Sequence, residues 1–172
     1  EISRSLDSYN SFEATTGYFG SEVIEKFEDK LIGIAKRGYC KILIGMIFRG
    51  AVTKKQKITL ENIDKKLRKI NSQSGIYILR RDYHGKIYRF QSNQEKIIYI
   101  GSSNFSNEGL NKRLECNIPI IDKENKTIVS NFVDYLFEHK ETVKLEDVEL
   151  KLKKQKQKKI KETLADYQRG ES

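Results

Sequence analysis

The stretch YHGKIYRFQSNQEKIIYIGSSNFSNEGLNKRLECN, residues 83–117, contains two apolar runs flanked by polar groups that can take part in chemistry. The runs predict strands over 84–90 and 96–102, because β-branched and aromatic residues concentrate in them and turn-forming residues follow. One of only two histidines in the chain, His84, stands two residues before Lys86. The stretch is therefore either a polar connection in a sheet or a functional site.

The pattern outside this stretch predicts an α/β protein. Strands are predicted over 14–19, 39–48, 75–80 and 114–121, and helices are predicted to begin at Ser21 and Thr59 and to cover 126–140 and 145–168. The helix over 126–140 is predicted to bury five apolar side chains: Val129, Phe132, Val133, Leu136 and Phe137. Because helices and strands alternate early and strands cluster in the middle, we expect a mixed β-sheet with helices on both faces.

Length and charge narrow the class of protein. A chain of 172 residues is long enough to bury one core, and it has no apolar run of about 18 residues that would span a membrane. The net charge of +9 favours a polyanionic partner. Seven lysines lie in KLKKQKQKKIK, residues 151–161, so the remainder carries only about +2. We expect a domain over 1–142, followed by a Lys-rich segment over 143–172 that is a solvated helix, a phosphate-binding segment or a linker.

The cysteines and the first residue bear on location and completeness. Cys40 and Cys116 stand in apolar runs and are expected to be reduced core thiols, which favours the cytoplasm. Neither forms a CxxC pair or a Cys/His cluster, so no zinc site is expected. The chain begins with Glu and shows no signal peptide, and we expect it to be a catalytic piece of a longer protein.

Three elements in the middle of the chain suggest phosphate chemistry. On a strand, His84 and Lys86 would point to the same face, so that an imidazole and an ammonium lie side by side. Ser102 and Asn104 follow a strand in the turn GSSN, where a hydroxyl, an amide and backbone N–H groups can hold an anion. Glu115 stands eleven residues after Asn104 and could hold the far ring nitrogen of His84.

The order HGK, GSSN and ECN resembles the motif of the phospholipase D superfamily, the HKD phosphodiesterases. ATTGYFG, the helix after it and KILIGM resemble the opening strand–helix–strand of that fold, so the resemblance covers residues 10–140. The nearest branch contains metal-independent restriction endonucleases and helicase-linked nuclease domains. One position departs from the longer consensus, because Gln91 stands where the family has an Asp.

The resemblance implies a phospholipase D-like mixed sheet and a mechanism. This chain has one HKD motif, so the family pattern implies a homodimer with one shared site. In it, His84 attacks phosphorus to form a phosphohistidine, and the partner's His84 serves as acid and then base. Lys86 and Asn104, helped by Ser102, hold phosphate oxygens, and Glu115 orients His84. No metal or other cofactor is implied, and the expected substrate is DNA.

Other functions remain open from the sequence. Gly75–Tyr77 and Tyr99–Gly101 spell GIY and YIG, with Arg113 after them, which resembles the metal-dependent GIY-YIG nucleases. An HKD enzyme acting on phospholipids is a second alternative, and a DNA-binding module without catalysis is a third. His139, in FEHKE, has no turn motif behind it and is expected to be a surface or cap residue.

Overall fold

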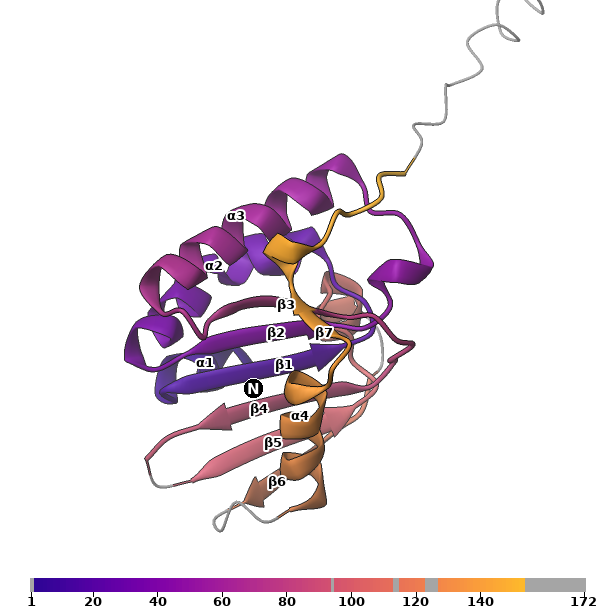
Figure 1. Ribbon diagram of the computed structural model, residues 1–172. Helices are drawn as coiled ribbons and strands as arrows, with labels where there is room; N and C mark the ends of the chain where they lie inside the picture. The colour runs from indigo at the N-terminus through magenta and orange to yellow at the C-terminus, as the bar shows by residue number, and fades with distance from the viewer. Residues whose placement is uncertain (1, 94, 113–114, 123–126, 154–172) are drawn as a thin grey trace, which may run out of the picture.

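The computed structural model describes residues 2–93, 95–112, 115–122 and 127–153 (Figure 1). In these ranges one seven-stranded sheet has the order β6-β5-β4-β1-β2-β3-β7. The strands are β1 Ser11–Thr16, β2 Cys40–Ile44, β3 Gly75–Leu79, β4 Lys86–Gln91, β5 Lys96–Gly101, β6 Asn117–Asp122 and β7 Thr142–Lys144. The helices are α1 Ile2–Ser8, α2 Ser21–Arg37, α3 Lys54–Ile70 and α4 Ile128–Glu138, with short turns η1 Ile47–Arg49, η2 Glu108–Lys112 and η3 Leu145–Asp147.

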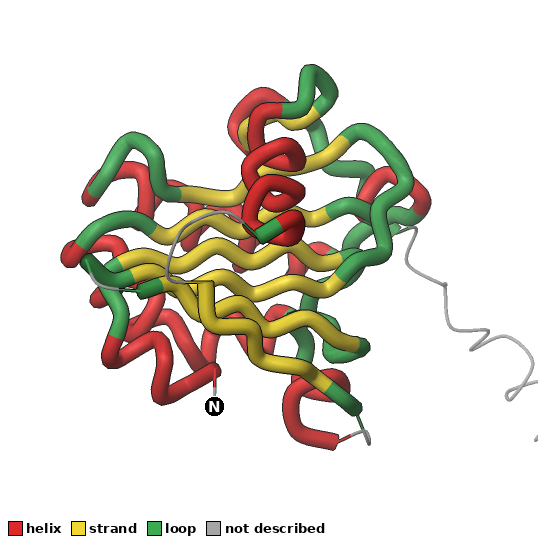
Figure 2. Tube along the Cα trace, turned by 90° about the horizontal axis from the view of Figure 1, so that it is seen from below, coloured by secondary structure: helices red, strands yellow, loops and turns green. Residues whose placement is uncertain are grey.

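The helices cover both faces of the sheet, as predicted. Figures 1 and 2 show α1, α2 and α3 on one face and α4 on the other. The strand period of two explains this layering. Ile42 and Ile44 of β2 belong to the main core under α2 and α3, whereas Leu43, between them, packs with Leu136 of α4. The fold is therefore the mixed α/β sheet with helices on both faces that the sequence predicted.

The strand directions bring several loops to one edge of the sheet. β1, β2 and β3 are parallel, and β4 runs antiparallel to β1, with Lys86 paired to Thr16. β5 is antiparallel to β4 in turn. The chain segments that leave β1, β2 and β5 and the segment that enters β4 consequently lie at the same edge. This edge, called the loop edge below, carries the candidate site.

Two helix predictions were wrong. α3 begins at Lys54, where Thr53 and Gln56 form a reciprocal capping box, and not at Thr59. Thr59 lies inside the helix and donates to the Glu25 carboxylate of α2. The helix predicted over 145–168 is also wrong for the described residues, because only η3 is helical there. The rest of that prediction, residues 154–168, lies outside the described residues.

The segment after α4 belongs to the folded domain. β7 pairs antiparallel with β3, and Leu145 and Leu150 are buried in the main core. Beyond them, Lys153 donates its backbone N–H to the carbonyl of Val52 over 2.8 Å, so this segment is fastened to the loop before α3. No helix in the described ranges is both long and apolar enough to cross a bilayer.

Single-residue predictions of burial were partly wrong. Val133 and Leu136 of α4 are buried, but Phe132 is 41% exposed, because α4 covers only a narrow strip of the sheet. Cys40 is buried as predicted, whereas Cys116 is exposed just before β6. β6 is an edge strand with few residues facing the core, so an apolar sequence there does not produce burial.

Candidate active site

His84 lies at the loop edge, directly over the segment that follows β1. A Cβ built on Gly17 would lie 2.9 Å from Cδ2 and 3.2 Å from Cα of His84, so only glycine lets this segment pass the histidine. The ring of Tyr18 meets the imidazole edge-on, with 5.5 Å between centroids. His84 stands before β4 and not on it. The prediction that His84 and Lys86 project from one strand face is therefore wrong.

His84 and Lys86 are nevertheless in contact. The Lys86 ammonium folds back, 2.8 Å from Nδ1 of His84, and donates to the His84 carbonyl over 2.7 Å. Lys86 is only 8% exposed. Burial lowers the pKa of the Lys86 ammonium below its ordinary value, and the negative charge of Glu115 opposes that shift. The pair is thus a partly desolvated cation beside a potential nucleophile.

Asn104 approaches the same cluster from the loop after β5. Its Oδ1 accepts from the backbone N–H of Tyr18 over 3.3 Å and from the Thr16 hydroxyl over 3.4 Å. The neighbouring Phe105 N–H also donates to the Thr16 hydroxyl, over 3.3 Å. Because the carboxamide oxygen is engaged in this way, the NH₂ group is the part of Asn104 that can donate to a phosphate oxygen.

Glu115 and Ser102 have different positions from those expected. Glu115 lines a surface cleft together with Asn104 and Tyr18. Within the described residues, the His84 ring contacts Lys86 and Tyr18, and Glu115 makes no hydrogen bond to it. Glu115 acts on Lys86 by charge. Ser102 is exposed, and its hydroxyl accepts from the Cys116 N–H over 3.2 Å, which ties the turn to β6.

Sequence reasoning missed the contribution of the loop after β1. Gly17 and Tyr18 touch His84 although 66 or more residues separate them in the chain. Tyr83 was missed as well, and its hydroxyl lies 2.7 Å from the Thr15 hydroxyl, which anchors the loop before β4. The glycine in ATTGYFG, where the predicted strand gives way to a loop, was the one available signal, because functional residues often lie on loops that follow strands.

The elements of the GIY-YIG alternative do not meet. Tyr77 lies on β3 and Tyr99 on β5, and three strands separate them in the sheet. The Tyr77 hydroxyl donates to the Gln73 carbonyl, and Tyr99 packs in the main core, so both act as strand aromatics. Arg113 lies outside the described residues. Within those residues, no group of three His, Cys, Asp or Glu side chains is placed to share a metal ion.

Gln91 and His139 both lie away from the cluster. Gln91, at the position of the family's missing Asp, ends β4 at the opposite end from Lys86, and its Oε1 accepts from Tyr39 over 3.4 Å. His139 caps the C-terminus of α4, and its Nδ1 accepts from the Glu141 N–H over 3.1 Å. The prediction that His139 is a cap residue is confirmed.

Three solved structures share this fold at low sequence identity. NucT from Helicobacter pylori is 15% identical, with a TM-score of 0.58, and the match covers 83% of this chain and 87% of NucT. Phosphatidylserine synthase from Haemophilus influenzae Rd KW20 is 15% identical, with a TM-score of 0.59, over 98% of this chain and 41% of the synthase. Polyphosphate kinase from Porphyromonas gingivalis is 13% identical, with a TM-score of 0.55, over 98% of this chain and 26% of the kinase.

The fold and the cluster at its loop edge define a domain of the phospholipase D class. The profile of a family described as the NgoFVII restriction endonuclease N-terminal PLD domain matches residues 2–152. The chain therefore belongs to that family, and the resemblance seen in the sequence is confirmed. It is a nuclease domain of the phospholipase D type. No match was found among the curated proteins.

Proposed function

We propose that this domain cleaves the phosphodiester backbone of DNA without a metal ion, through a covalent intermediate on His84. The convergence of His84, Lys86 and Asn104 at the loop edge is the observation that supports this proposal most directly. A nucleophile, a cation and an amide are thus brought to one edge of the sheet, next to a cleft lined by Asn104 and Tyr18. The family's name, a restriction endonuclease, supports DNA as the substrate.

The contact between Lys86 and His84 suggests how the site responds to substrate. The ammonium now lies against the Nδ1 lone pair. A phosphate gives it an anionic partner, and its movement toward a phosphate oxygen uncovers the ring. Hydrogen bonds of this kind are commonly rearranged between the free enzyme and the substrate complex. Glu115 favours the charged form of Lys86, which keeps the cation available to the phosphate.

Two histidines are needed for the two steps, and we propose that two chains supply them. An unprotonated ring nitrogen of one His84 attacks phosphorus, a P–N bond forms, and the P–O bond to the leaving group breaks. The partner's His84 gives its proton to the leaving oxygen. That second histidine then takes a proton from water, whose oxygen attacks phosphorus and breaks the P–N bond. Lys86 and Asn104, with Ser102 proposed as a helper, stabilise the charge on the non-bridging oxygens.

Site and sequence together favour a catalytic part of a restriction endonuclease. We propose that the Lys-rich segment beginning at residue 151 connects the domain to a DNA-recognition domain or adds phosphate contacts. Its seven lysines would make binding weaken as the salt concentration rises.

Cleavage of DNA in EDTA tests the mechanism. We expect wild-type protein to cut DNA with EDTA present, and His84→Ala to lower the rate by more than about 10³-fold, because the nucleophile is lost. The matched control is His139→Ala, which removes the other histidine and should keep the activity. Cleavage that requires added magnesium and disappears in Tyr77→Phe would instead support the GIY-YIG alternative.

A further inference from the structure

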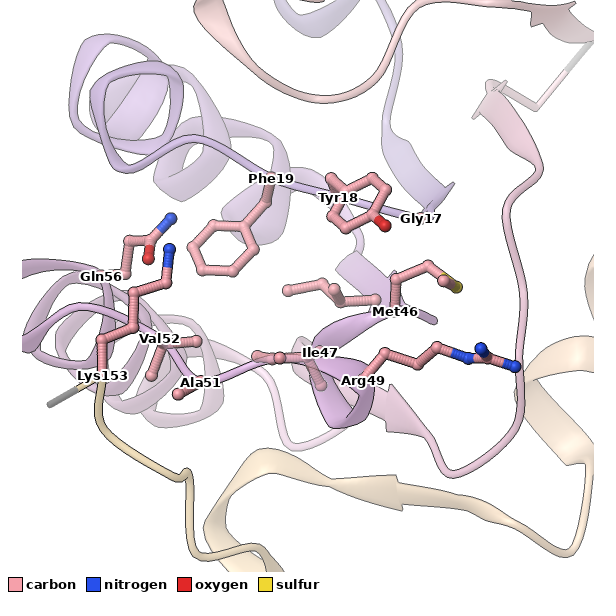
Figure 3. Close-up of a pocket in the computed structure, with 12 residues that line it drawn as sticks. Gly17, Tyr18, Phe19, Met46, Ile47, Arg49, Ala51, Val52, Gln56 and Lys153 are labelled. Atoms are coloured by element: carbon pink, nitrogen blue, oxygen red, sulfur yellow. The ribbon is translucent and has the colours of Figure 1, made fainter.

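A cavity of about 230 Å³ lies beside His84 at the carboxyl ends of β1 and β2 (Figure 3). Two of its residues also adjoin the histidine. Gly17 passes so close that a Cβ on it would lie 2.9 Å from Cδ2 of the imidazole, and Tyr18 meets the ring edge-on. A group bound in this cavity would therefore sit next to whatever occupies the proposed catalytic site. None of the catalytic roles proposed above uses the cavity.

The walls of the cavity are apolar and partly aromatic. Figure 3 shows the rings of Phe19 and Tyr18 along one side and aliphatic side chains along the other. The aliphatic wall consists of Ile44, Met46, Ile47, Ala51 and Val52. Tyr18 is 49% exposed, so one aromatic face is open to a ligand. A cavity between aromatic and aliphatic walls suits a flat ring that can stack on the aromatic side.

Polar groups stand at the two ends of the cavity. Arg49 is at one end, and Gln56 and Lys153 lie together at the other (Figure 3). The side chains of Arg49 and Asp82 form an exposed ion pair that fixes the first end. The backbone bond from Lys153 to Val52 holds the second. Because Asp82 offsets the charge of Arg49, the positive charge that lines the cavity comes from Lys153 at the second end.

Gln56 restricts which hydrogen-bonding groups a ring bound in the cavity can present. Its Oε1 accepts the Thr53 N–H over 2.9 Å in the capping box of α3, so that oxygen is engaged. The amide NH₂ group lies next to the Lys153 ammonium and is available as a donor to a ligand in the cavity. Both groups are donors, and a bound ring must therefore present an acceptor, such as a carbonyl oxygen or an unprotonated ring nitrogen.

We propose that this cavity binds one nucleobase of the substrate strand, turned out of the stack, from the nucleotide next to the scissile phosphate. The inference rests on the proposed function. A simple anion would leave the apolar walls uncovered, and a purely aliphatic ligand would leave the Gln56 and Lys153 donors without partners. A nucleobase satisfies the walls by stacking and the donors through its acceptor edge. The domain therefore prefers DNA in which that base is free to leave a duplex.

Binding to paired oligonucleotides tests the proposal. We would measure the affinity of the His84→Ala protein for a single-stranded thymidine oligonucleotide and for one of the same length in which every nucleotide is abasic. Both carry the same phosphates, so their difference reports the base. We expect the base-bearing strand to bind about tenfold more tightly, a typical gain for one stacked base. Equal affinities would overturn the proposal.

Two substitutions locate the effect. Ala51→Phe fills the cavity, and Gln56→Glu keeps the capping oxygen but removes the donor. Each substitution, combined with His84→Ala, should remove the preference for the base-bearing strand. Ala51→Phe should also leave the affinity for the abasic strand unchanged, because it changes no charge. Gln73→Glu adds the same charge outside the cavity and should keep the preference. Melting temperatures exclude unfolding as the cause, and a preference that survives Ala51→Phe in folded protein would overturn the proposal.

Cleavage by the otherwise wild-type protein separates this proposal from the mechanism. Cutting of both strands at equal rates would contradict the base site and leave the mechanism standing. Failure to cut either strand, together with base-dependent binding that Ala51→Phe removes, would contradict the mechanism and leave the base site standing.

Discussion

Lys86 is the residue at which function and stability are in conflict. The residue is only 8% exposed, and its ammonium is hydrogen-bonded to the ring and carbonyl of His84. Burial is the larger influence on the pKa of Lys86 and lowers it, and the charge of Glu115 only partly offsets this. A cation held in this way disfavours the folded state but is available to a phosphate.

Lys86→Met is expected to abolish DNA cleavage and to raise the free energy of unfolding by about 1 kcal/mol, because a buried charge is replaced by an apolar side chain of similar length. Urea denaturation and cleavage assays on the same preparation measure the two effects. Lys36→Met, at an exposed position on α2, is the control and should change neither quantity.

The difference in free energy of unfolding between the wild type and Lys86→Met should depend on pH with a definite sign. A lowered pKa means that the unfolded chain binds the Lys86 proton more tightly than the folded protein does. The stability of the wild type should therefore rise relative to Lys86→Met as the pH increases toward the ordinary lysine pKa of about 10.4. A difference that is the same at about pH 7 and about pH 10 would show that burial of the charge is not its cause.

The site could be predicted from sequence only in part. HGK and GSSN each keep their functional groups within a few residues, so His84, Lys86, Ser102 and Asn104 were visible as motifs. The contacts of His84 with Gly17 and Tyr18 were not, because they depend on the pairing of β1 with β4. The position of Glu115 relative to Lys86 depends likewise on how the loop before β6 returns to the sheet.

At the scale of elements, a buried ionic cluster fastens α4 to the sheet. Arg89 of β4 bonds Glu13 of β1 through Nε over 2.5 Å and donates to the Ser130 carbonyl of α4 over 2.9 Å. Its remaining nitrogen reaches Asp134, also of α4, over 2.5 Å. Arg89 and Glu13 are each 3% exposed. Since α4 is the one helix described on its face of the sheet, this cluster supports much of its attachment.

Arg89→Leu is expected to lower the free energy of unfolding by about 3 kcal/mol, because it leaves the buried Glu13 carboxylate with a single ion-pair partner, the Lys41 ammonium at 3.4 Å. The double variant Glu13→Leu with Arg89→Leu should recover most of the loss, since no buried charge remains. Urea denaturation of both proteins measures this. A double variant as unstable as the single one would mean that packing around Arg89, and not charge, determines its role.

Sequence patterns predicted some helices and strands of this fold and missed others. The strands in the middle of the chain are clear because each is a compact apolar run. The start of α3 was misplaced because its first turn, Lys54–Lys57, is polar and the apolar stripe begins only at Leu60. α1 and β7 were missed because seven and three residues are too few to show a period. The order of the strands depends on pairings between distant segments, which no local pattern contains.

At the scale of the whole molecule, one chain offers one histidine at the loop edge. Nucleophilic attack and proton donation need two groups, and His139 is engaged as the cap of α4. The proposed mechanism is therefore complete only when two chains meet at their loop edges with two-fold symmetry. Such a site makes activity a property of pairs of chains, which can be measured without a structure of the dimer.

Mixing wild-type chains with His84→Ala chains should lower activity more steeply than dilution does. If each site needs a histidine from both chains, only wild-type pairs cut DNA, and activity falls as the square of the wild-type fraction once subunits have exchanged. A monomeric enzyme would lose activity in proportion to that fraction. The chains are mixed in urea, refolded together and assayed in EDTA at constant total protein.

The control for this mixing experiment is His139→Ala, which should leave the activity per chain unchanged at every ratio because its histidine takes no part in the site. A linear decrease with His84→Ala, in a preparation that sedimentation shows to be dimeric, would mean that each chain contains a complete site. The proton donor would then have to come from the same chain, and Lys86, already in contact with His84, would be the candidate to examine.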